Sequence, residues 1–372
     1  MLDKFKISKK LLRQLDFGII ITCVIIVLFS CLNIYSATYR TVGIYYAKLQ
    51  FLWMIVGAIV IYIILLEDYV IIGNYAGIIY WAGIVLLILN DFVLGSTHKG
   101  AKGWIGIGSR AIQPSEFAKL GMIIMLAKLW DDIDGKINEP KNFFKVAFYA
   151  ILPMTLIVIQ PDMGMTMVTF FIALGIFFIG GLDLKVILGG LVSIFIVIVG
   201  VWNSPLMPAY WKGRLTSFIN PEAHVQGLTY QLKQSIMGIG SGNVLGEGFQ
   251  KGLQVAGNNI PEAHTDFIFA VVGEEWGLIG AIFLLFLYGF LVYRFIKIAK
   301  HSKDIFGTII TVGVVSTFLF SILQNIGMTI GLMPITGITL PLMSYGGSSI
   351  LSNCMSIGLV LNIGMRRKKI NF

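Results

Sequence analysis

The sequence predicts an all-α polytopic membrane protein, a single transmembrane domain over residues 1–372 with about ten helices. Of the residues, 56% are hydrophobic and only 13% are charged, and the mean hydropathy of +0.84 lies outside the range of soluble proteins. Many nearly uncharged runs also reach the roughly 20 residues that a helix needs to cross a hydrocarbon core. Lipid must therefore surround most of the chain, which excludes a soluble enzyme.

Ten apolar runs predict the transmembrane helices in order. They cover residues 16–36, 44–66, 72–94, 114–131, 143–160, 164–181, 186–204, 267–293, 306–330 and 347–365. Pro114 suits the first position of the fourth helix, where its missing N–H is not needed. The turn QPDMG, 160–164, separates the fifth helix from the sixth. The first run is long enough to span and lacks a small-residue cleavage site, so we expect a retained helix and not a signal peptide.

The net charge of +9 indicates membrane topology, because most basic residues flank apolar runs. One side of the predicted bundle collects the N-terminal lysines, Lys136, Lys141, Arg294, Lys297, Lys300, Lys303 and the tail MRRKK. This side holds about twice as many basic residues as the other and is therefore predicted to be cytoplasmic. Both termini then lie inside. The loops at about 95–113 and 205–265, the second between helices 7 and 8, are extracytoplasmic. A nucleic-acid binder is disfavoured.

Several motifs of soluble enzymes are absent from the sequence. There is no phosphate-binding P-loop and no His-Glu-x-x-His zinc motif. The glycine-rich stretch GIGSGNVLGEG, 238–248, is a weak nucleotide signal and is interpreted as a flexible loop or an anion-binding nest. Because Cys23, Cys31 and Cys354 all fall in apolar runs, we expect neither a disulfide nor a metal cluster.

Polar residues recur where a membrane makes them costly. Glu116 and Lys119 share a helix face and could form an ion pair, or Glu116 could cap the helix while Lys119 reaches the interface. Asp162 stands in the QPDMG turn, for which turn chemistry alone is a sufficient explanation. The serines of ITLPLMSYGGSS, 338–349, could cap the last helix or line a cavity. Capping is favoured for each of them.

The stretch PEAHTDFIFAVVGEEWG, 261–277, carries the most unusual charges. Thr265 or Asp266 could cap the helix that follows, which would leave Asp266 at its mouth. Glu274 and Glu275 would lie deeper and on different faces, so at least one should brace another helix. Their candidate partners are Lys119, Arg110 and Arg214.

These polar groups gather at the outer ends of the predicted helices and in the outward loops. A transporter would instead place its essential charges near the midplane, at broken helices. An outward site with one carboxylate, several basic residues and apolar surroundings suits an anionic, lipid-anchored substrate.

Five ordered motifs resemble the SEDS family, named for shape, elongation, division and sporulation. They are GWIGIGS with QPSEFAK, QPDMG, TYQLKQSIMGIGSG, PEAHTDFIFAVVGEEWG and PITGITLPLMSYGGSS. The resemblance implies an inverting peptidoglycan glycosyltransferase that polymerises lipid II on the outer face of the bacterial cytoplasmic membrane. It also implies a class B penicillin-binding protein as partner, together with other elongation-complex membrane proteins. Residues 325–349 and 234–249 are more similar to elongation members than to division or sporulation members.

The resemblance also assigns site residues. The family's essential aspartate falls on Asp266, its outer-loop tryptophan on Trp104, and its buried ion pair on Glu116 and Lys119. Trp104 is equally consistent with an interfacial belt residue. Lys119, Arg214 or Lys233 could neutralise the substrate diphosphate, and a divalent cation, Mg²⁺ or Mn²⁺, could share that task. The other predicted substrate-binding residues are Arg110, Asp162, Gln234, His264, Thr265, Ser344 and Ser348.

Two alternatives from other classes remain open. A flippase for lipid-linked precursors would contact the headgroup along the whole depth of the bundle and form no glycosidic bond. A scaffold for wall-synthesis partners would be indifferent to the loss of Asp266. A division- or sporulation-type polymerase is the alternative within the same class.

Overall fold

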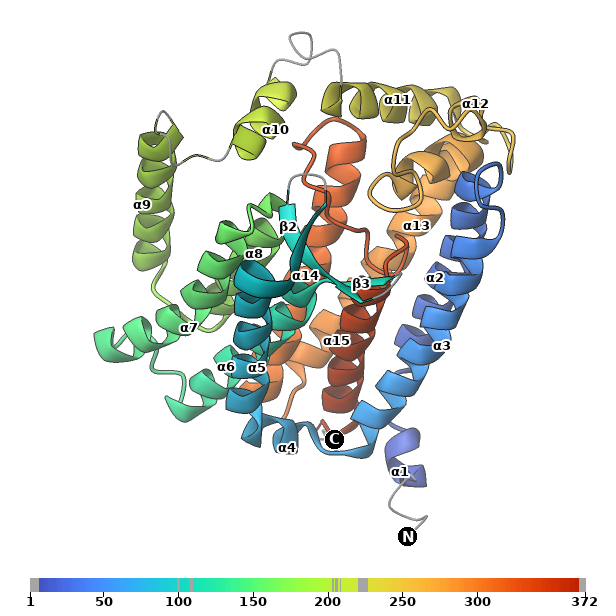
Figure 1. Cartoon of the computed structure of the whole chain (residues 1–372). Helices are drawn as coiled ribbons and strands as arrows, with labels where there is room; N and C mark the ends of the chain where they lie inside the picture. The colour runs from blue at the N-terminus through green and yellow to red at the C-terminus, as the bar shows by residue number, and fades with distance from the viewer. Residues whose placement is uncertain are drawn as a thin grey trace.

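The computed structural model describes residues 7–98, 101–107, 110–202, 204, 207, 209–219 and 227–367. Within these ranges a long helix stands at each of the ten predicted positions (Figure 1). They are α2 (Phe17–Thr38), α3 (Tyr45–Leu66), α5 (Ala76–Leu89), α6 (Pro114–Asp132), α7 (Pro140–Ile159), α8 (Met163–Ile179), α9 (Leu184–Trp202), α13 (Ile268–Lys300), α14 (Ile305–Thr329) and α15 (Gly347–Met365). The predicted helical membrane fold is confirmed.

Eight of these helices are long and apolar enough to cross a membrane by themselves, counting α5 together with the π-helical turn η2 (Asn90–Leu94). The other two differ for physical reasons. Helix α8 is apolar but has only 17 residues. Helix α6 carries charged residues, among them Glu116 and Lys119. An isolated helix with such charges would be costly in lipid, so α6 depends on the surrounding helices.

The two predicted outer loops contain structure of their own. The described residues of the first loop form a three-stranded antiparallel sheet in the order β1 (Gly95–His98), β2 (Ala101–Ile107) and β3 (Arg110–Ile112). The loop before α13 holds α10 (Ala209–Ile219), α11 (Leu228–Ser241) and α12 (Leu253–Ala256). The sheet was not foreseen, because its strands are short and lack a clear apolar–polar alternation.

Helices α14 and α15 form the centre of the bundle. In their most apolar windows, 72% and 89% of the residues are buried, whereas Ile187 is the one buried residue of α9. Figure 1 accordingly shows α9 at the edge of the molecule. The buried helix α15 is rich in small polar residues, with Ser348, Ser349, Ser352, Asn353 and Ser356 all buried. These residues present hydrogen-bonding groups inside an otherwise apolar bundle.

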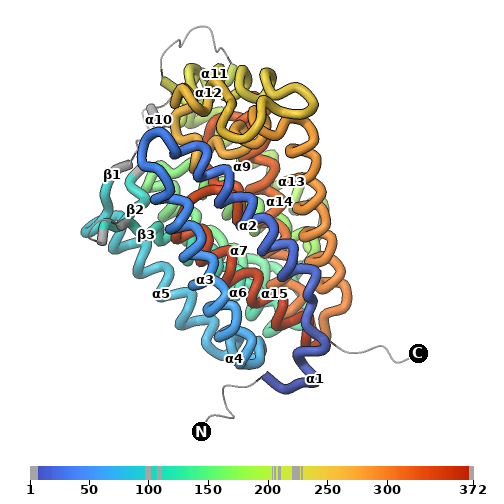
Figure 2. The backbone as a smooth tube through the Cα atoms, turned by 90° about the vertical axis from the view of Figure 1, so that its right-hand side faces the viewer, coloured from blue at the N-terminus to red at the C-terminus, as the bar shows by residue number. Residues whose placement is uncertain are grey.

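The ends of the bundle are distinct. The short helix α1 (Lys9–Leu12) and the last turn of α15 lie at one end, with α4 (Tyr69–Asn74), while α11 and α12 lie at the other (Figures 1 and 2). The α7–α8 turn contacts both predicted outer loops. In the first of them, the Lys102 backbone amide of β2 donates to the Gln160 carbonyl at 3.1 Å. From α10, Trp211 donates to the Pro161 carbonyl at 2.9 Å. Sheet and α10 therefore meet at one turn.

Helix α13 is broken at Gly277, whose φ of 61° and ψ of −158° are not helical. The glycine-rich segment 242–248 pairs with the backbone groups that the break leaves open. Glu247 N–H donates to the Glu274 carbonyl at 2.9 Å, and Leu278 N–H donates to the Asn243 carbonyl at 3.0 Å. A β-carbon on Gly246 would lie 2.2 Å from the Glu275 carbonyl oxygen. The interpretation of this stretch as a flexible loop or phosphate nest is therefore replaced by a packing role.

The two adjacent acids of α13 hold the same region together. The Glu274 carboxylate accepts bonds from the Gln254 and Val255 amides, at 2.6 and 3.0 Å, at the start of α12. The Glu275 carboxylate accepts from the Ser36 hydroxyl of α2 and from the Gln250 amide at 3.2 Å. The prediction that one acid braces another helix is confirmed through Glu275.

Two of the cations proposed as partners of these acids contact other groups in the structure. Lys119 pairs with Glu116 instead, and Arg214 donates to the Ile335 carbonyl. The Arg110 side chain lies outside the described part of the structure. Backbone amides and a serine hydroxyl donate to the two acids, and Lys119 and Arg214 bond elsewhere.

Candidate active site

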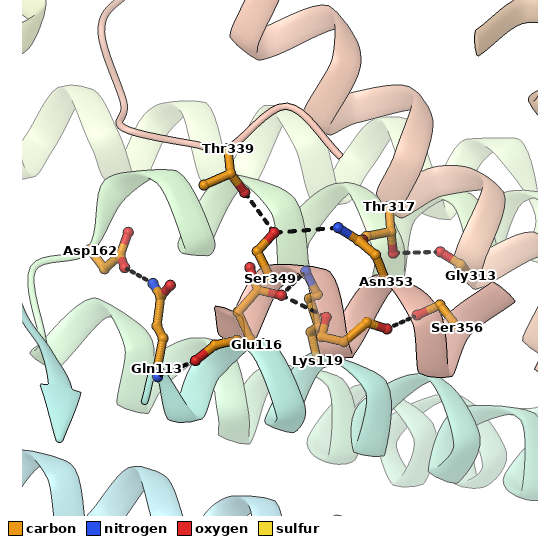
Figure 3. A network of polar contacts seen from close by, with 12 residues as sticks. Gln113, Glu116, Lys119, Asp162, Gly313, Thr317, Thr339, Ser349, Asn353 and Ser356 are labelled. Carbon is orange, nitrogen blue, oxygen red and sulfur yellow. Dashed lines mark hydrogen bonds and ion pairs between the residues drawn. The ribbon is translucent and has the colours of Figure 1, made fainter. Parts of the chain in front are cut away.

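A polar cavity lies among α6, α8, α14, α15 and the segment 333–346. Its polar lining consists of Gln113, Glu116, Lys119, Asp162, Ser321, Thr339, Ser349 and Asn353. Figure 3 shows most of these side chains converging from α6, α8 and α15. Such a concentration of polar groups inside an apolar bundle indicates a functional site.

Glu116 and Lys119 form a buried ion pair on one wall of the cavity. The Lys119 Nζ lies 2.6 Å from the Glu116 Oε2, and each residue is 4% exposed. Ser352 of α15 donates its hydroxyl to the same carboxylate oxygen at 2.6 Å. The predicted pair is confirmed, and the alternative that Lys119 reaches the interface is wrong. The pair also ties α6 to α15.

Asp162 caps helix α8 and at the same time faces the cavity. Its Oδ1 accepts the Met165 amide at 2.9 Å, and its Oδ2 accepts the side-chain amide of Gln113 at 3.3 Å. Burial raises the pKa of the Asp162 carboxyl, while the Met165 amide, the Arg214 charge and Gln113 lower it. The turn interpretation is correct for Asp162 but incomplete, because the same side chain lines the cavity.

Asp266 lies in the turn before α13 and is held through its backbone. The Asn325 side chain of α14 donates to the Asp266 carbonyl and to the Ile338 carbonyl, each at 2.8 Å. The residue that caps α13 is Phe267, and it makes no side-chain capping bond. The Thr265 hydroxyl donates to Glu262 at 2.9 Å. Capping of α13 by Thr265 or Asp266 is therefore wrong.

Asp266 and Arg214 meet beside Gly337. A β-carbon on Gly337 would lie 3.6 Å from the Asp266 Oδ2 and 3.8 Å from the Arg214 Nη1. Gly337 has a φ of +75° and itself lines the cavity. Arg214 comes from α10, is 6% exposed and donates to the Ile335 carbonyl at 2.7 Å. An acid and a guanidinium thus flank a glycine at the cavity wall.

The serines of the 338–349 stretch divide between two roles. The Ser344 hydroxyl accepts the Leu340 amide at 2.8 Å and donates to the Thr265 carbonyl at 2.6 Å. The Ser348 hydroxyl accepts the Gln113 amide at 3.2 Å. Helix α15 is capped by Gly346 without a side-chain bond. The favoured capping role is therefore wrong, because the serines join neighbouring segments and Ser349 lines the cavity.

The remaining predicted residues lie farther from the cavity lining. Trp104 is half-buried in β2, where the adjacent Gly103 lies beside Asp162. The His264 ring stacks on the Tyr46 ring with their centroids 4.7 Å apart. On α11, Lys233 is exposed and Gln234 is half-buried. Arg110 begins β3, and its side chain is outside the described residues.

Several polar residues of this region were not foreseen from the sequence, Ser321 of the cavity lining among them. Gln113, Thr339 and Asn353 line the cavity, and Asn325 ties Asp266 to the neighbouring segment. Asn325 and Asn353 carried a usable signal, since an amide inside an apolar span needs a buried partner. Gln113 and Thr339 lie outside helices, where polar residues are ordinary.

The described residues contain no group of three or more His, Cys, Asp or Glu side chains that could hold a metal ion. The acids of the cavity, Glu116 and Asp162, are instead engaged by Lys119, Ser352, Gln113 and the Met165 amide.

Comparisons with known proteins cover almost the entire chain. The family model described as Cell cycle protein, for FtsW, RodA and SpoVE, matches residues 12–369. Stage V sporulation protein E of Bacillus subtilis strain 168 is 33% identical over 362 residues, 96% of this chain and 97% of that protein. Peptidoglycan glycosyltransferase MrdB of Escherichia coli K12 is 32% identical over 360 residues, 96% and 95% of the two chains.

Two solved structures share the fold. A chain from a structure described as the coordination of polymerization and crosslinking by a peptidoglycan synthase complex matches with a TM-score of 0.81 and 29% identity. That match covers 94% of this chain and 97% of the other. The rod shape determining protein RodA of Thermus thermophilus matches with a TM-score of 0.72 and 27% identity, over 95% and 98% of the chains.

Proposed function

The chain belongs to the FtsW, RodA and SpoVE family of cell cycle proteins and is a peptidoglycan glycosyltransferase; we propose that it polymerises lipid II into β-1,4 glycan strands at the outer face of the cytoplasmic membrane. The observation that carries this proposal is the position of the Asp266 carboxylate, beside Arg214 and Gly337 at a polar cavity within the bundle. A transferase for a lipid-linked, anionic substrate needs these elements in one place.

Asp266 is the proposed general base. The acceptor is a lipid II whose sugar hydroxyl attacks the anomeric carbon of a glycan carried on a polyprenyl diphosphate. As the new carbon–oxygen bond forms, the hydroxyl proton passes to the Asp266 carboxylate. The bond from the anomeric carbon to the diphosphate breaks, and its electron pair leaves with the diphosphate. Attack opposite the leaving group inverts an α-linkage to β.

Arg214 is the proposed partner of the diphosphate. Its buried guanidinium lies near both Asp266 and Asp162, and the planar fork of arginine suits paired phosphate oxygens. Positive charge held there stabilises the charge that develops on the leaving group. Lys119 is already paired with Glu116 at 2.6 Å. Lys233 is exposed on α11, and its proposed role is to contact the anionic part of an approaching substrate.

The remaining cavity residues supply binding groups for the sugar and peptide parts. Gln113, Thr339 and Asn353 offer neutral donors and acceptors to hydroxyl and amide groups. Trp104 in the neighbouring sheet offers a flat apolar face to a sugar ring or a prenyl chain. The prenyl chains of both substrates would remain among the apolar helices and lipid.

A class B penicillin-binding protein is the proposed partner, and cell elongation the proposed setting. The partner proposal is supported by the likeness to a chain of a peptidoglycan synthase complex that coordinates polymerization with crosslinking. The elongation proposal is supported by the resemblance of residues 325–349 to elongation members of the family. Relatives named for sporulation, rod shape and division have comparable identity to this chain, so a genetic test must decide the setting.

Incubation of the purified full chain and its penicillin-binding partner with labelled lipid II in detergent tests the reaction. Long glycan strands, released as disaccharide repeats by a muramidase, are the expected product. A flippase or a scaffold would leave the lipid II intact, because detergent offers no second leaflet and neither activity forms a bond. Intact lipid II with a partner of proven activity would overturn the proposal.

A further inference from the structure

A basic pocket is lined by residues of the α1 segment, and Figure 2 shows α1 at the end of the bundle opposite α11 and α12. The charged residues of its lining are Lys9, Lys10, Arg13, Arg294, Arg367 and Asp16. Arg294 and Asp16 neutralise each other, since the guanidinium contacts both carboxylate oxygens at 2.6 to 3.1 Å. Four cations therefore face the pocket with no ion pair to any acid among the described residues. Such a pocket attracts an anion.

An apolar groove of about 930 Å³, open side included, begins beside this pocket. It runs between α2, α3 and α15, which contribute Val24, Ala58 and Cys354 among others. On α3 the lining extends from Met54 to Leu65, about 16 Å along the helix axis. Half of a hydrocarbon core is about 15 Å deep. The groove therefore has the length that one acyl chain occupies in one leaflet.

The two features meet at the segment around α1. Leu15 lines both the pocket and the groove. In the same segment Leu12 faces the groove, whereas Lys9 and Arg13 line the pocket. A segment that presents cations to one side and leucines to the other matches a molecule with an anionic head and an apolar tail. Neither feature is used by the proposed glycosyl transfer.

We propose that this composite feature binds one anionic membrane phospholipid. Its phosphate would contact Lys9, Lys10, Arg13 and Arg367, and one acyl chain would lie in the groove between α2, α3 and α15. Under the predicted topology the site opens to the cytoplasmic leaflet, whose anionic lipids attract basic segments. The bound lipid would fix α1 against α15 at the end of the bundle opposite the transfer site.

Native mass spectrometry of the full chain, purified in detergent and delipidated, tests the proposal. The probes are phosphatidylglycerol and phosphatidylcholine with identical acyl chains. We expect one phosphatidylglycerol to bind at least about tenfold more tightly than phosphatidylcholine, because several cations contact the anionic head. Equal affinity for the two lipids would overturn the proposal.

Matched variants separate the pocket from general surface charge. Lys9→Ala, Lys10→Ala and Arg13→Ala together should abolish the preference for phosphatidylglycerol. Lys136→Ala, Lys141→Ala and Lys145→Ala remove the same charge from exposed positions on the α6–α7 loop and α7, and they should leave the preference unchanged. An equal loss in both triple variants would show non-specific attraction and would contradict the site.

A second pair of variants tests the groove without altering charge. Ala58 lines the groove and is exposed, so Ala58→Phe fills it without disturbing the packed core. This change should weaken the binding of both lipids, whereas Ile59→Phe on the adjacent exposed position should not. Unchanged binding by Ala58→Phe, or glycerol phosphate binding as tightly as phosphatidylglycerol, would show that no acyl chain occupies the groove.

Discussion

The side-chain amide of Asn325 donates a 2.8 Å hydrogen bond to the carbonyl oxygen of Asp266. The same nitrogen donates at 2.8 Å to the Ile338 carbonyl, in the segment that carries Gly337. Asn325 is fully buried in α14, at the centre of the bundle. The proposed base therefore lies on a turn that one buried amide ties to the segment carrying Gly337 and Ile338, both of which line the cavity.

Asn325→Ala should lower the rate of glycan polymerisation by about tenfold or more, since two carbonyls lose a shared donor and the turn loosens. Asn362→Ala is the matched control, because Asn362 is also fully buried and donates to two carbonyls, those of Ile64 and Glu67, at the opposite end of the bundle. Thermal unfolding should show destabilisation of both variants. If Asn362→Ala loses as much activity as Asn325→Ala, the positioning role is refuted.

Gly337→Ala should also lower polymerisation by about tenfold or more, because its methyl group would enter the space between Asp266 and Arg214. The positive φ adds a backbone cost of about 1 kcal/mol. Gly43→Ala imposes the same kind of cost at a φ of +64°, where no atom lies within 4 Å. Comparing labelled lipid II turnover by the two variants separates the effect of the added methyl group from that of backbone strain. Equal turnover would contradict a site formed jointly by Asp266 and Arg214.

Glu116→Gln should destabilise the protein by about 3–5 kcal/mol, because it leaves the Lys119 ammonium buried without its partner. Adding Lys119→Met should recover part of this loss. Asp132→Asn breaks the exposed Lys128–Asp132 pair, at 2.9 Å, and should cost less than about 1 kcal/mol. Thermal unfolding in one detergent provides the comparison. Equal effects of Glu116→Gln and Asp132→Asn would mean that the buried pair does not hold α6 to α15.

Gly246→Ala should destabilise the protein by about 2 kcal/mol beyond the cost of its positive φ, since its β-carbon would lie 2.2 Å from the Glu275 carbonyl oxygen. Gly181→Ala is the control, with a φ of +89° and no atom within 4 Å of the added carbon. The unfolding temperatures of the two variants measure the difference. Indistinguishable temperatures would show that the 242–248 segment does not need to enter the break in α13.

The helices could be predicted from the sequence because apolar length alone determines what crosses a membrane. The break at Gly277 could not, because Gly277 lies inside the run 267–293, which predicts one continuous helix. Its cause lies some 30 residues earlier in the chain, where the 242–248 segment supplies the missing hydrogen bonds. The sheet at 95–112 was missed for the related reason that short strands gain their stability from pairing and not from composition.

The site was predictable in its charges but not in its geometry. The spacing of Glu116 and Lys119 predicts their ion pair, because residues three positions apart on a helix lie on the same face. The same local rules assigned Asp266 to a cap, and there they failed, since Phe267 caps α13. What places Asp266 is Asn325, 59 residues away, and no local pattern reports that contact. Lys233 has the charge expected of a residue that neutralises the diphosphate, but it lies exposed on α11 and is not among the residues that line the cavity.

The most direct test of Asp266 as the general base is the rate of lipid II polymerisation by Asp266→Asn, measured with the penicillin-binding partner in detergent. The substitution keeps the size of the side chain and the backbone bond from Asn325 but removes the proton acceptor. Asp183→Asn, an exposed acid between α8 and α9, is the matched control. If Asp266 is the base, Asp266→Asn lowers the amount of glycan product by at least about a hundredfold, whereas Asp183→Asn gives the normal amount. Equal polymer from both variants would contradict the role of Asp266 as the base.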